Sequence, residues 1–262
     1  MATKTWPLTS VGVASYEYLP LTEFLGPDGQ RELQKLLDSY TRSPSTPYSS
    51  ASIYYDIAIS ILKSKDEGSG SFLAVAAQSV LPTDSASKDS PTAPVPEKFI
   101  TLGTMLSQLL SGGSVHITSS DTSKPPLIDP KYLTHPLEME AFARHIRYLE
   151  TIAVSEPFHS LLKENGRRRD PKSNLRDLET AKDYIRTSAI SMWHPTSTCA
   201  MLPRDKGGVV DEDPIVYGTS NLRVVDASII PLIPRANVQS TVYAVAQRAA
   251  DLIKAKHNLT NG

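Results

Sequence analysis

The sequence predicts an α+β fold, with a mostly antiparallel sheet that carries helices on one face, followed by a short strand and a long C-terminal helix. Three observations predict it. Two short apolar runs, 99–106 and 113–119, are typical of strands. Residues 136–152 repeat apolar side chains at helical spacing, which predicts a helix that packs on the sheet. Residues 238–256 carry a second long apolar stripe after a short apolar run at 222–226.

The composition is that of an ordinary globular protein. Its 262 residues are enough for one large domain or two small ones, and 40% of them are hydrophobic. Lys and Arg total 27 and Asp and Glu total 28, so no basic excess favours nucleic-acid binding. The single cysteine, Cys199, excludes an internal disulfide framework and a cysteine-cluster metal site. We expect no metal, because the other histidines lack ligand spacing: His116, His135, His145, His159 and His257.

The sequence contains neither a membrane span nor a visible secretory signal. No apolar run is long enough to cross a bilayer, and the first seven residues lack an apolar core. We therefore expect a cytoplasmic protein without a membrane partner, and secretion stays open if the native product is longer.

In the first half of the chain, residues 6–29 read as irregular chain or short strands, because small polar and apolar residues alternate among prolines. Residues 31–40 have helical spacing. Residues 51–62 are helix-like, but their mixed periodicity leaves a strand open. Residues 72–81 are apolar and rich in Val and Ala. Residues 82–96 are rich in Ser, Asp and Pro and predict a surface loop.

In the second half, the strongest helix is 136–152, and a further helix is expected at 175–187. The apolar stripe of helix 136–152 consists of Met139, Phe142, Ile146 and Leu149. Residues 167–169 form a short basic run, interpreted as a solvated turn. Residues 190–201 and 222–226 read as strands.

Two segments near the C-terminal end are dense in residues that carry chemistry. The first contains His194, which precedes a proline and therefore favours an extended backbone. A lone histidine is more often structural than catalytic. The second segment runs from Asp226 to Asn237, where Asn237 is a good N-cap for the last helix. The free amides at a helix start suit an anionic group, such as the pyrimidine end of a reduced flavin.

Together these segments resemble the C-terminal part of the glucose–methanol–choline (GMC) oxidoreductases. The matching run is WHPTSTCAMLPRDKGGVVDEDPIVYGTSNLRVVDASIIPLIPRANVQSTVYAVAQRAADLI, residues 193–253. A second match covers residues 113–142, and residues 6–19 are similar to an internal family segment. The resemblance implies an FAD-dependent oxidoreductase of a small-molecule alcohol, and we expect a place in secondary metabolism.

The resemblance assigns catalytic roles to two positions. His194 falls on the family's catalytic base, which takes the hydroxyl proton while hydride leaves the alcohol carbon for flavin N5. An imidazole suits this task because its pKa lies near working pH. Asn237 falls on the partner position, where it would donate a hydrogen bond to the substrate oxygen. The substrate pocket is expected between these two residues and the sheet.

The resemblance also assigns residues to the cofactor FAD. Trp193 falls beside the isoalloxazine ring. Asp226 and Ala227 fall on the segment that lines the ribityl chain and pyrophosphate. Val238 and Gln239 fall at the helix start, where backbone amides face the flavin pyrimidine.

The family's N-terminal GxGxxG turn is absent from this sequence. Gly68-Ser69-Gly70 comes nearest, but Leu73 stands where the third glycine is needed. The resemblance therefore implies a chain that starts inside the substrate domain, with residues 1–200 as a partial substrate domain and 201–262 as the C-terminal segment of the FAD domain. A separate N-terminal FAD-domain chain or a homodimer would then complete the protein.

Two other interpretations stay open on the sequence alone. The same pocket would serve a non-redox cyclase or dehydratase, with His194 as general acid and base, and the family resemblance includes a member with such chemistry. Alternatively, the chain is an inactive truncated remnant that acts as an interaction module, because a missing flavin half leaves apolar surface uncovered.

Overall fold

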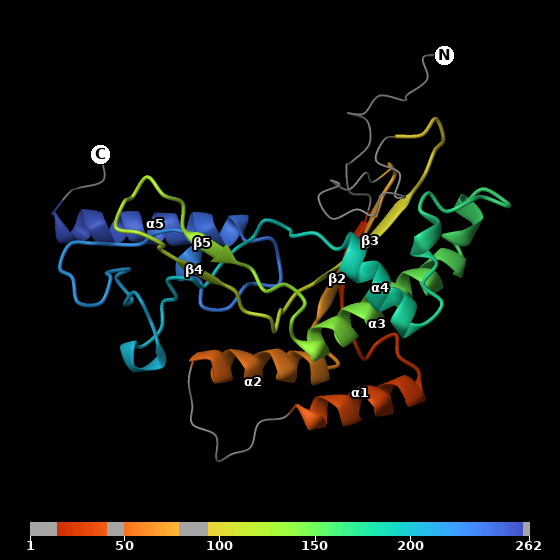
Figure 1. Ribbon diagram of the computed structural model, residues 1–262, viewed down its shortest axis with the longest axis horizontal. Coiled ribbons are helices and arrows are strands. Elements are labelled where there is room, and N and C mark those ends of the chain that lie inside the picture. Colours follow the sequence, from red (N-terminus) through yellow and green to blue (C-terminus); the bar gives the residue numbers. More distant parts are fainter. Residues whose placement is uncertain (1–14, 41–49, 79–93, 259–262) are drawn as a thin grey trace. The chain divides into compact units, whose positions relative to one another are not determined.

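The computed structural model describes residues 15–40, 50–78 and 94–258, and the side chains of 50–52 are outside this description (Figure 1). Residues 6–14 and most of the expected loop 82–96 therefore lie outside the described residues. The chain divides into two compact units, each assembled from three segments. The first unit comprises 1–37, 61–106 and 133–190, and the second comprises 38–60, 107–132 and 191–262. The functional division expected near residue 200 stays a prediction.

The first unit contains a three-stranded antiparallel sheet. Its strands are β1 (Ser15–Leu19), β2 (Gly70–Val75) and β3 (Thr101–Leu106), in the order β1-β2-β3. Tyr18 pairs with Ser71, and Phe72 pairs with Thr104. The predicted combination of an antiparallel sheet with helices is confirmed.

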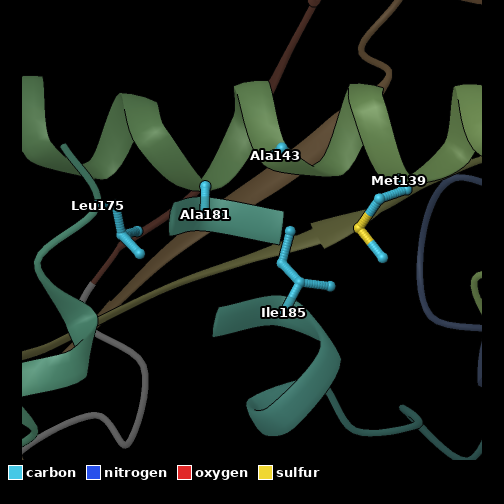
Figure 2. Close-up of a cluster of buried hydrophobic side chains, with 5 residues drawn as sticks. All are labelled: Met139, Ala143, Leu175, Ala181 and Ile185. Carbon is cyan, nitrogen blue, oxygen red and sulfur yellow. The ribbon is translucent and has the colours of Figure 1, made fainter. Parts of the chain in front are cut away.

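Three helices accompany this sheet: α1 (Pro27–Ser39), α3 (Pro136–Val154) and α4 (Leu178–Ser188). Helix α3 begins where His135 accepts a hydrogen bond from the Leu137 amide and Pro136 occupies the first position. Asp177 caps α4 by accepting from the Thr180 amide over 2.8 Å. Helices α3 and α4 pack together, and their shared core is the cluster in Figure 2: Met139, Ala143, Leu175, Ala181 and Ile185.

Helix α3 buries a second face, which lies outside the apolar stripe predicted from its sequence. Its central residue is His145, which is fully buried and packs against the rings of Phe24 and Phe72, which also contact each other. His145 Nε2 is 3.1 Å from the Ser69 hydroxyl. A Cβ atom built on Gly70 would lie only 2.7 Å from this ring, so β2 approaches α3 closely because Gly70 has no side chain.

The polar side chains between α3 and α4 form a compact ion network. Glu140 accepts from Lys182 over 2.7 Å and from Arg144 over 2.8 Å. Burial by itself would raise the pKa of Glu140. The hydrogen bonds and charges of Lys182 and Arg144 outweigh burial, so the pKa of this carboxyl lies below its ordinary value.

The basic run 167–169 lies outside regular secondary structure, and its Arg167 and Arg168 side chains are exposed as expected, but each guanidinium also has a partner. Arg167 pairs with Glu97 and lies 5.6 Å from the Phe99 ring centre. Arg168 makes a two-pronged contact with Glu150, and Arg169 donates to Gln78 over 3.3 Å. These contacts link positions 18 to 91 residues apart, and no local pattern predicts which of them pair.

The second unit contains a two-stranded antiparallel hairpin and the last helix. The hairpin joins β4 (Ser114–His116) to β5 (Leu127–Asp129), and Val115 pairs with Ile128. Helix α5 spans Gln239–Lys256, as expected within one residue at its start. Helix α2 (Ser50–Lys63) settles the choice left open for 51–62 in favour of a helix, and its last residues belong to the first unit.

Two expected strands are wrong in detail. Residues 190–201 and 222–226 form no regular strand, and within them only isolated bridges occur, Met201 with Val210 and Arg223 with Ile215. Prolines at 195, 203 and 214 interrupt this region, and its amides bond to carbonyls of turns rather than to a strand ladder. None of the described helices is both long enough and apolar enough to span a membrane.

Candidate functional site

The segment that carries the proposed base is irregular and begins with an unusual backbone. Trp193 has a φ of 54°, in the left-handed region that a bulky side chain rarely occupies. Its amide donates to the Ser191 hydroxyl over 3.0 Å, and its side chain is 68% exposed. His194 follows and is half-buried. Within the described part of the chain, its Nε2 atom is buried and has no hydrogen-bond partner.

Three hydrogen bonds join the segment after His194 to residues 228–230. The Ser197 hydroxyl donates to the Ile230 carbonyl over 2.9 Å. The amides of Cys199 and Met201 donate to the carbonyls of Ser228 and Ile229 over 3.0 and 2.8 Å. Because Ile229 and Ile230 are buried, this attachment is part of the second unit's core. Cys199 is half-buried, in line with a small packing residue.

Asp226 organises the turn that receives these bonds. Its Oδ1 atom accepts from the Ser228 amide over 2.8 Å and from the Ser228 hydroxyl over 2.5 Å. Asp226 thereby caps the short 3-10 helix Ala227–Ile229. The Asp226 carboxylate is thus a structural cap for the turn whose Ser228 carbonyl accepts the hydrogen bond from the Cys199 amide.

Helix α5 begins one residue later than expected, which corrects the assignment of Asn237 as its N-cap. Val238 is the capping position, and no side chain bonds to the first-turn amides. The first turn also carries no acidic residue. Asn237 and Gln239 are exposed, whereas Val238 is 8% exposed. The start of α5 therefore offers uncapped amides and partial positive charge.

All seven residues singled out by sequence lie in the second unit: Trp193, His194, Asp226, Ala227, Asn237, Val238 and Gln239. The structure joins the His194 segment to the Asp226 turn through Cys199 and Ser228. It does not join His194 to Asn237 by a hydrogen bond at Nε2. Whether these residues act as assigned stays a prediction.

Ser197 and Ser228 were missed by the sequence reasoning, although both help to hold the site together. Hydroxyl residues are common in this stretch, so the only available signal was their position close to His194 and Asp226.

These residues suit one end of a flavin. An uncapped helix start can receive the anionic pyrimidine, an exposed indole can pack on a ring, and an unpartnered imidazole can accept a proton. No matching cradle for the adenylate end is present around Gly68 and Gly70. Those glycines accommodate Tyr18 and His145, because a Cβ at either position would clash with these side chains.

No group of three or more His, Cys, Asp and Glu side chains is placed to hold a metal ion within residues 15–40, 50–78 and 94–258. The histidines and carboxylates described here are instead caps, ion-pair partners or single residues.

A sequence model for GMC oxidoreductases matches residues 110–246, which is more than half of the chain. The chain belongs to the GMC oxidoreductase family. The match covers the motif region 113–142 and most of the region 193–253, and the model describes the C-terminal part of these proteins. The predicted family and its C-terminal location are therefore confirmed.

Two curated relatives have similar sequence identity to this chain. Mala s 12, a GMC oxidoreductase family protein from Malassezia sympodialis, is 38% identical over 154 residues, covering 59% of this chain and 24% of that protein. Patulin synthase from Penicillium expansum is 36% identical over 157 residues, covering 58% of this chain and 24% of the synthase. The matched part thus spans about a quarter of the length of these relatives.

Solved structures share the fold of this chain. An FAD-dependent oxidoreductase from Chaetomium thermophilum has a TM-score of 0.70 at 22% identity, covering 94% of this chain and 39% of that chain. A fungal aryl-alcohol oxidase has a TM-score of 0.65 at 24% identity, covering 96% of this chain and 40% of the oxidase. At these identities the likeness confirms the GMC fold, and this chain spans about two fifths of those proteins.

Proposed function

We propose that this chain carries the flavin-facing C-terminal part of an FAD-dependent GMC oxidoreductase that oxidises a small molecule at an alcohol carbon. The observation that carries the proposal is the buried, unpartnered Nε2 of His194 on a segment bonded to the Asp226 turn. The FAD prediction agrees with the family of the chain and with its structural similarity to an FAD-dependent oxidoreductase from Chaetomium thermophilum.

His194 is the general base in this proposal. The Nε2 atom has no protein partner, so it is available to accept the substrate hydroxyl proton. Partial burial limits competition from water for that nitrogen. Asn237 supports the reaction by donating a side-chain hydrogen bond to the substrate oxygen, and its exposed amide has no other hydrogen bond among the described residues.

The FAD-contacting residues are Trp193, Asp226, Ala227, Val238 and Gln239 in this proposal. FAD, when bound, supplies the acceptor for the hydride that leaves the alcohol carbon. The exposed indole of Trp193 packs on the ring system. The amides of Val238 and Gln239 would bind the negative pyrimidine end, since no side-chain cap occupies them at that helix start. Asp226 holds the turn of Ala227 in shape.

The proposal includes a division of labour along the chain. Residues 1–200 contribute to the substrate domain, and 201–262 form the C-terminal segment of the FAD domain. The adenylate end of the cofactor then requires an N-terminal FAD-domain part, since Gly68 and Gly70, the pair nearest to a GxGxxG turn, pack closely against Tyr18 and His145. A homodimer is the other partner we consider. A place in secondary metabolism is supported by the relative named patulin synthase, and a cytoplasmic location stays a prediction from sequence.

The test combines the purified chain with excess FAD and a panel of primary alcohols without oxygen. We expect alcohol-dependent bleaching of the visible flavin absorption, because reduced flavin accumulates when no oxidant is present. His194→Ala should slow bleaching by about 10²–10⁴-fold, the contribution usual for a general base. Arg204→Ala, an exposed substitution outside the site, is the matched control and should bleach at the parent rate. Substrate turnover without bleaching would favour the cyclase or dehydratase interpretation. Neither bleaching nor turnover would leave two interpretations, a split enzyme that needs its N-terminal FAD-domain part and the inactive remnant.

A further inference from the structure

Ser197 combines a left-handed backbone with a hydroxyl that reaches a neighbouring segment. Its φ is 74°, a region that favours glycine and that serine seldom adopts. Its Oγ atom donates to the Ile230 carbonyl over 2.9 Å and lies 3.0 Å from Thr196 Oγ1. An unfavourable backbone conformation is therefore retained at a position where the side chain makes a specific contact.

Ser197 is also the first attachment point after His194. The backbone attachments begin at Cys199 and continue at Met201. Several described residues after His194 donate hydrogen bonds to the 226–230 turn. Of these donors, Ser197 is the nearest to His194 in the sequence. Its acceptor belongs to Ile230, which is 7% exposed, so the hydroxyl is tied to a buried part of the second unit.

The His194 ring has no hydrogen bond of its own at Nε2 within the described residues. Its orientation must then depend on packing and on the backbone of the turn that follows it. We propose that Ser197 is a positioning residue for His194, whose hydroxyl fixes this turn and so keeps the imidazole nitrogen buried and correctly directed. The importance of this for catalysis rests on the proposed function, but the positioning itself requires no flavin.

Four variants separate the hydroxyl from the backbone. Ser197→Ala removes the hydroxyl and keeps the Cβ atom, whereas Ser197→Gly removes the hydroxyl and relaxes the left-handed backbone. Ser197→Asn is the rescue variant, because asparagine tolerates this backbone region and its side-chain amide can donate to Ile230. Thr198→Ala is the matched control, since this neighbouring hydroxyl is exposed and has no hydrogen bond among the described residues.

The measurement is the rate at which diethyl pyrocarbonate modifies each histidine, followed by mass spectrometry on the intact full chain. The exposed His257 serves as internal reference, and the fully buried His145 reports any loosening of the whole chain. We expect Ser197→Ala and Ser197→Gly to raise the His194 rate relative to His257 about fivefold, the population change expected for one lost hydrogen bond. Ser197→Asn should restore protection, and Thr198→Ala should leave it unchanged.

An unchanged His194 rate in both Ser197→Ala and Ser197→Gly would overturn the proposal. So would a failure of Ser197→Asn to restore protection, an equal rise in Thr198→Ala, or a parallel rise at His145, because each points away from the Ser197 hydroxyl. These outcomes are independent of alcohol oxidation, so failure of the positioning role and failure of the proposed function are distinguishable.

Discussion

The Cys199 amide donates to the Ser228 carbonyl over 3.0 Å, which fixes the His194 segment against the Asp226 turn. The two segments are far apart in the sequence, yet the turn is itself held by the Asp226 carboxylate. His194, assigned as the general base, and Asp226 and Ala227, assigned to the cofactor, therefore lie on two segments joined by hydrogen bonds. We call these joined segments the frame. The account of function depends on this frame being intact.

The frame should weaken when the Asp226 carboxylate is removed. Asp226→Ala deletes the acceptor of both Ser228 bonds, so we expect a loss of about 1 kcal/mol, the usual cost of a lost cap. Asp226→Asn keeps an acceptor oxygen at this position and should lose less. Urea unfolding of the three proteins measures the differences, and equal midpoints for the parent and Asp226→Ala would show that the cap contributes nothing.

Gly70 should tolerate no side chain. Gly70→Ala places a Cβ 2.7 Å from the His145 ring, which Phe24 and Phe72 contact, so we expect destabilisation of about 1–3 kcal/mol. Gly112→Ala is the control, because no atom lies within 4 Å of the added Cβ. Its effect should stay within about 0.5 kcal/mol. Thermal unfolding of both variants checks this, and similar melting temperatures would contradict the close packing.

His145 should make the folding stability depend on pH. Burial lowers the pKa of His145 from the ordinary 6.5 to about 3. Between these values the unfolded chain binds a proton that the folded chain excludes, so the free energy of unfolding increases with pH in this window. The contribution is complete above about pH 6.5 and is lost as pH falls, by up to about 1.4 kcal/mol per unit.

The measurement for this pH dependence is chemical unfolding from pH 4 to pH 7 in the parent and in His145→Gln. Glutamine cannot titrate, so the variant should show a shallower slope even if it is less stable throughout. Parallel slopes would mean that His145 is not the responsible group.

The ion network between α3 and α4 should contribute more to the free energy of unfolding than an exposed ion pair within α4. Lys182→Met leaves the mostly buried Glu140 carboxylate without one of its two close cations, and we expect a loss of about 1–3 kcal/mol. Arg186→Ala breaks an exposed i,i+3 pair with Asp183 and should cost less than about 0.5 kcal/mol. Unfolding free energies in low and high salt test both, and an equal loss in the two variants would rule out the distinction.

The helices were predictable because their apolar periodicity is local. The α3 stripe at Met139, Phe142 and Ile146 appears in the core as expected. The second buried face of α3, centred on His145, was not predictable, because its burial depends on β2, which lies more than seventy residues away along the chain. The same reason explains the arginine run 167–169, whose partners come from distant segments.

The candidate site was predictable in composition but not in backbone form. Motif resemblance singled out His194, Asp226 and Asn237, whose roles stay predictions, whereas the family is confirmed. Apolar alternation suggested strands around the first two, whereas the structure forms turns whose bonds run from amides to turn carbonyls. Asn237 looked like an N-cap on residue preference alone, and the helix begins after Val238 instead.

The most direct test of the central claim is a titration of the isotopically labelled chain with flavin mononucleotide, followed through backbone amide resonances. This ligand carries the flavin ring without the adenylate end. We predict saturable shifts at Ala227, Val238 and Gln239, quenching of Trp193 fluorescence that Trp193→Phe abolishes, and no comparable shifts with ADP. Unmoved amides at these positions, or shifts with ADP alone, would contradict the claim that this chain holds the flavin-facing part of a GMC oxidoreductase.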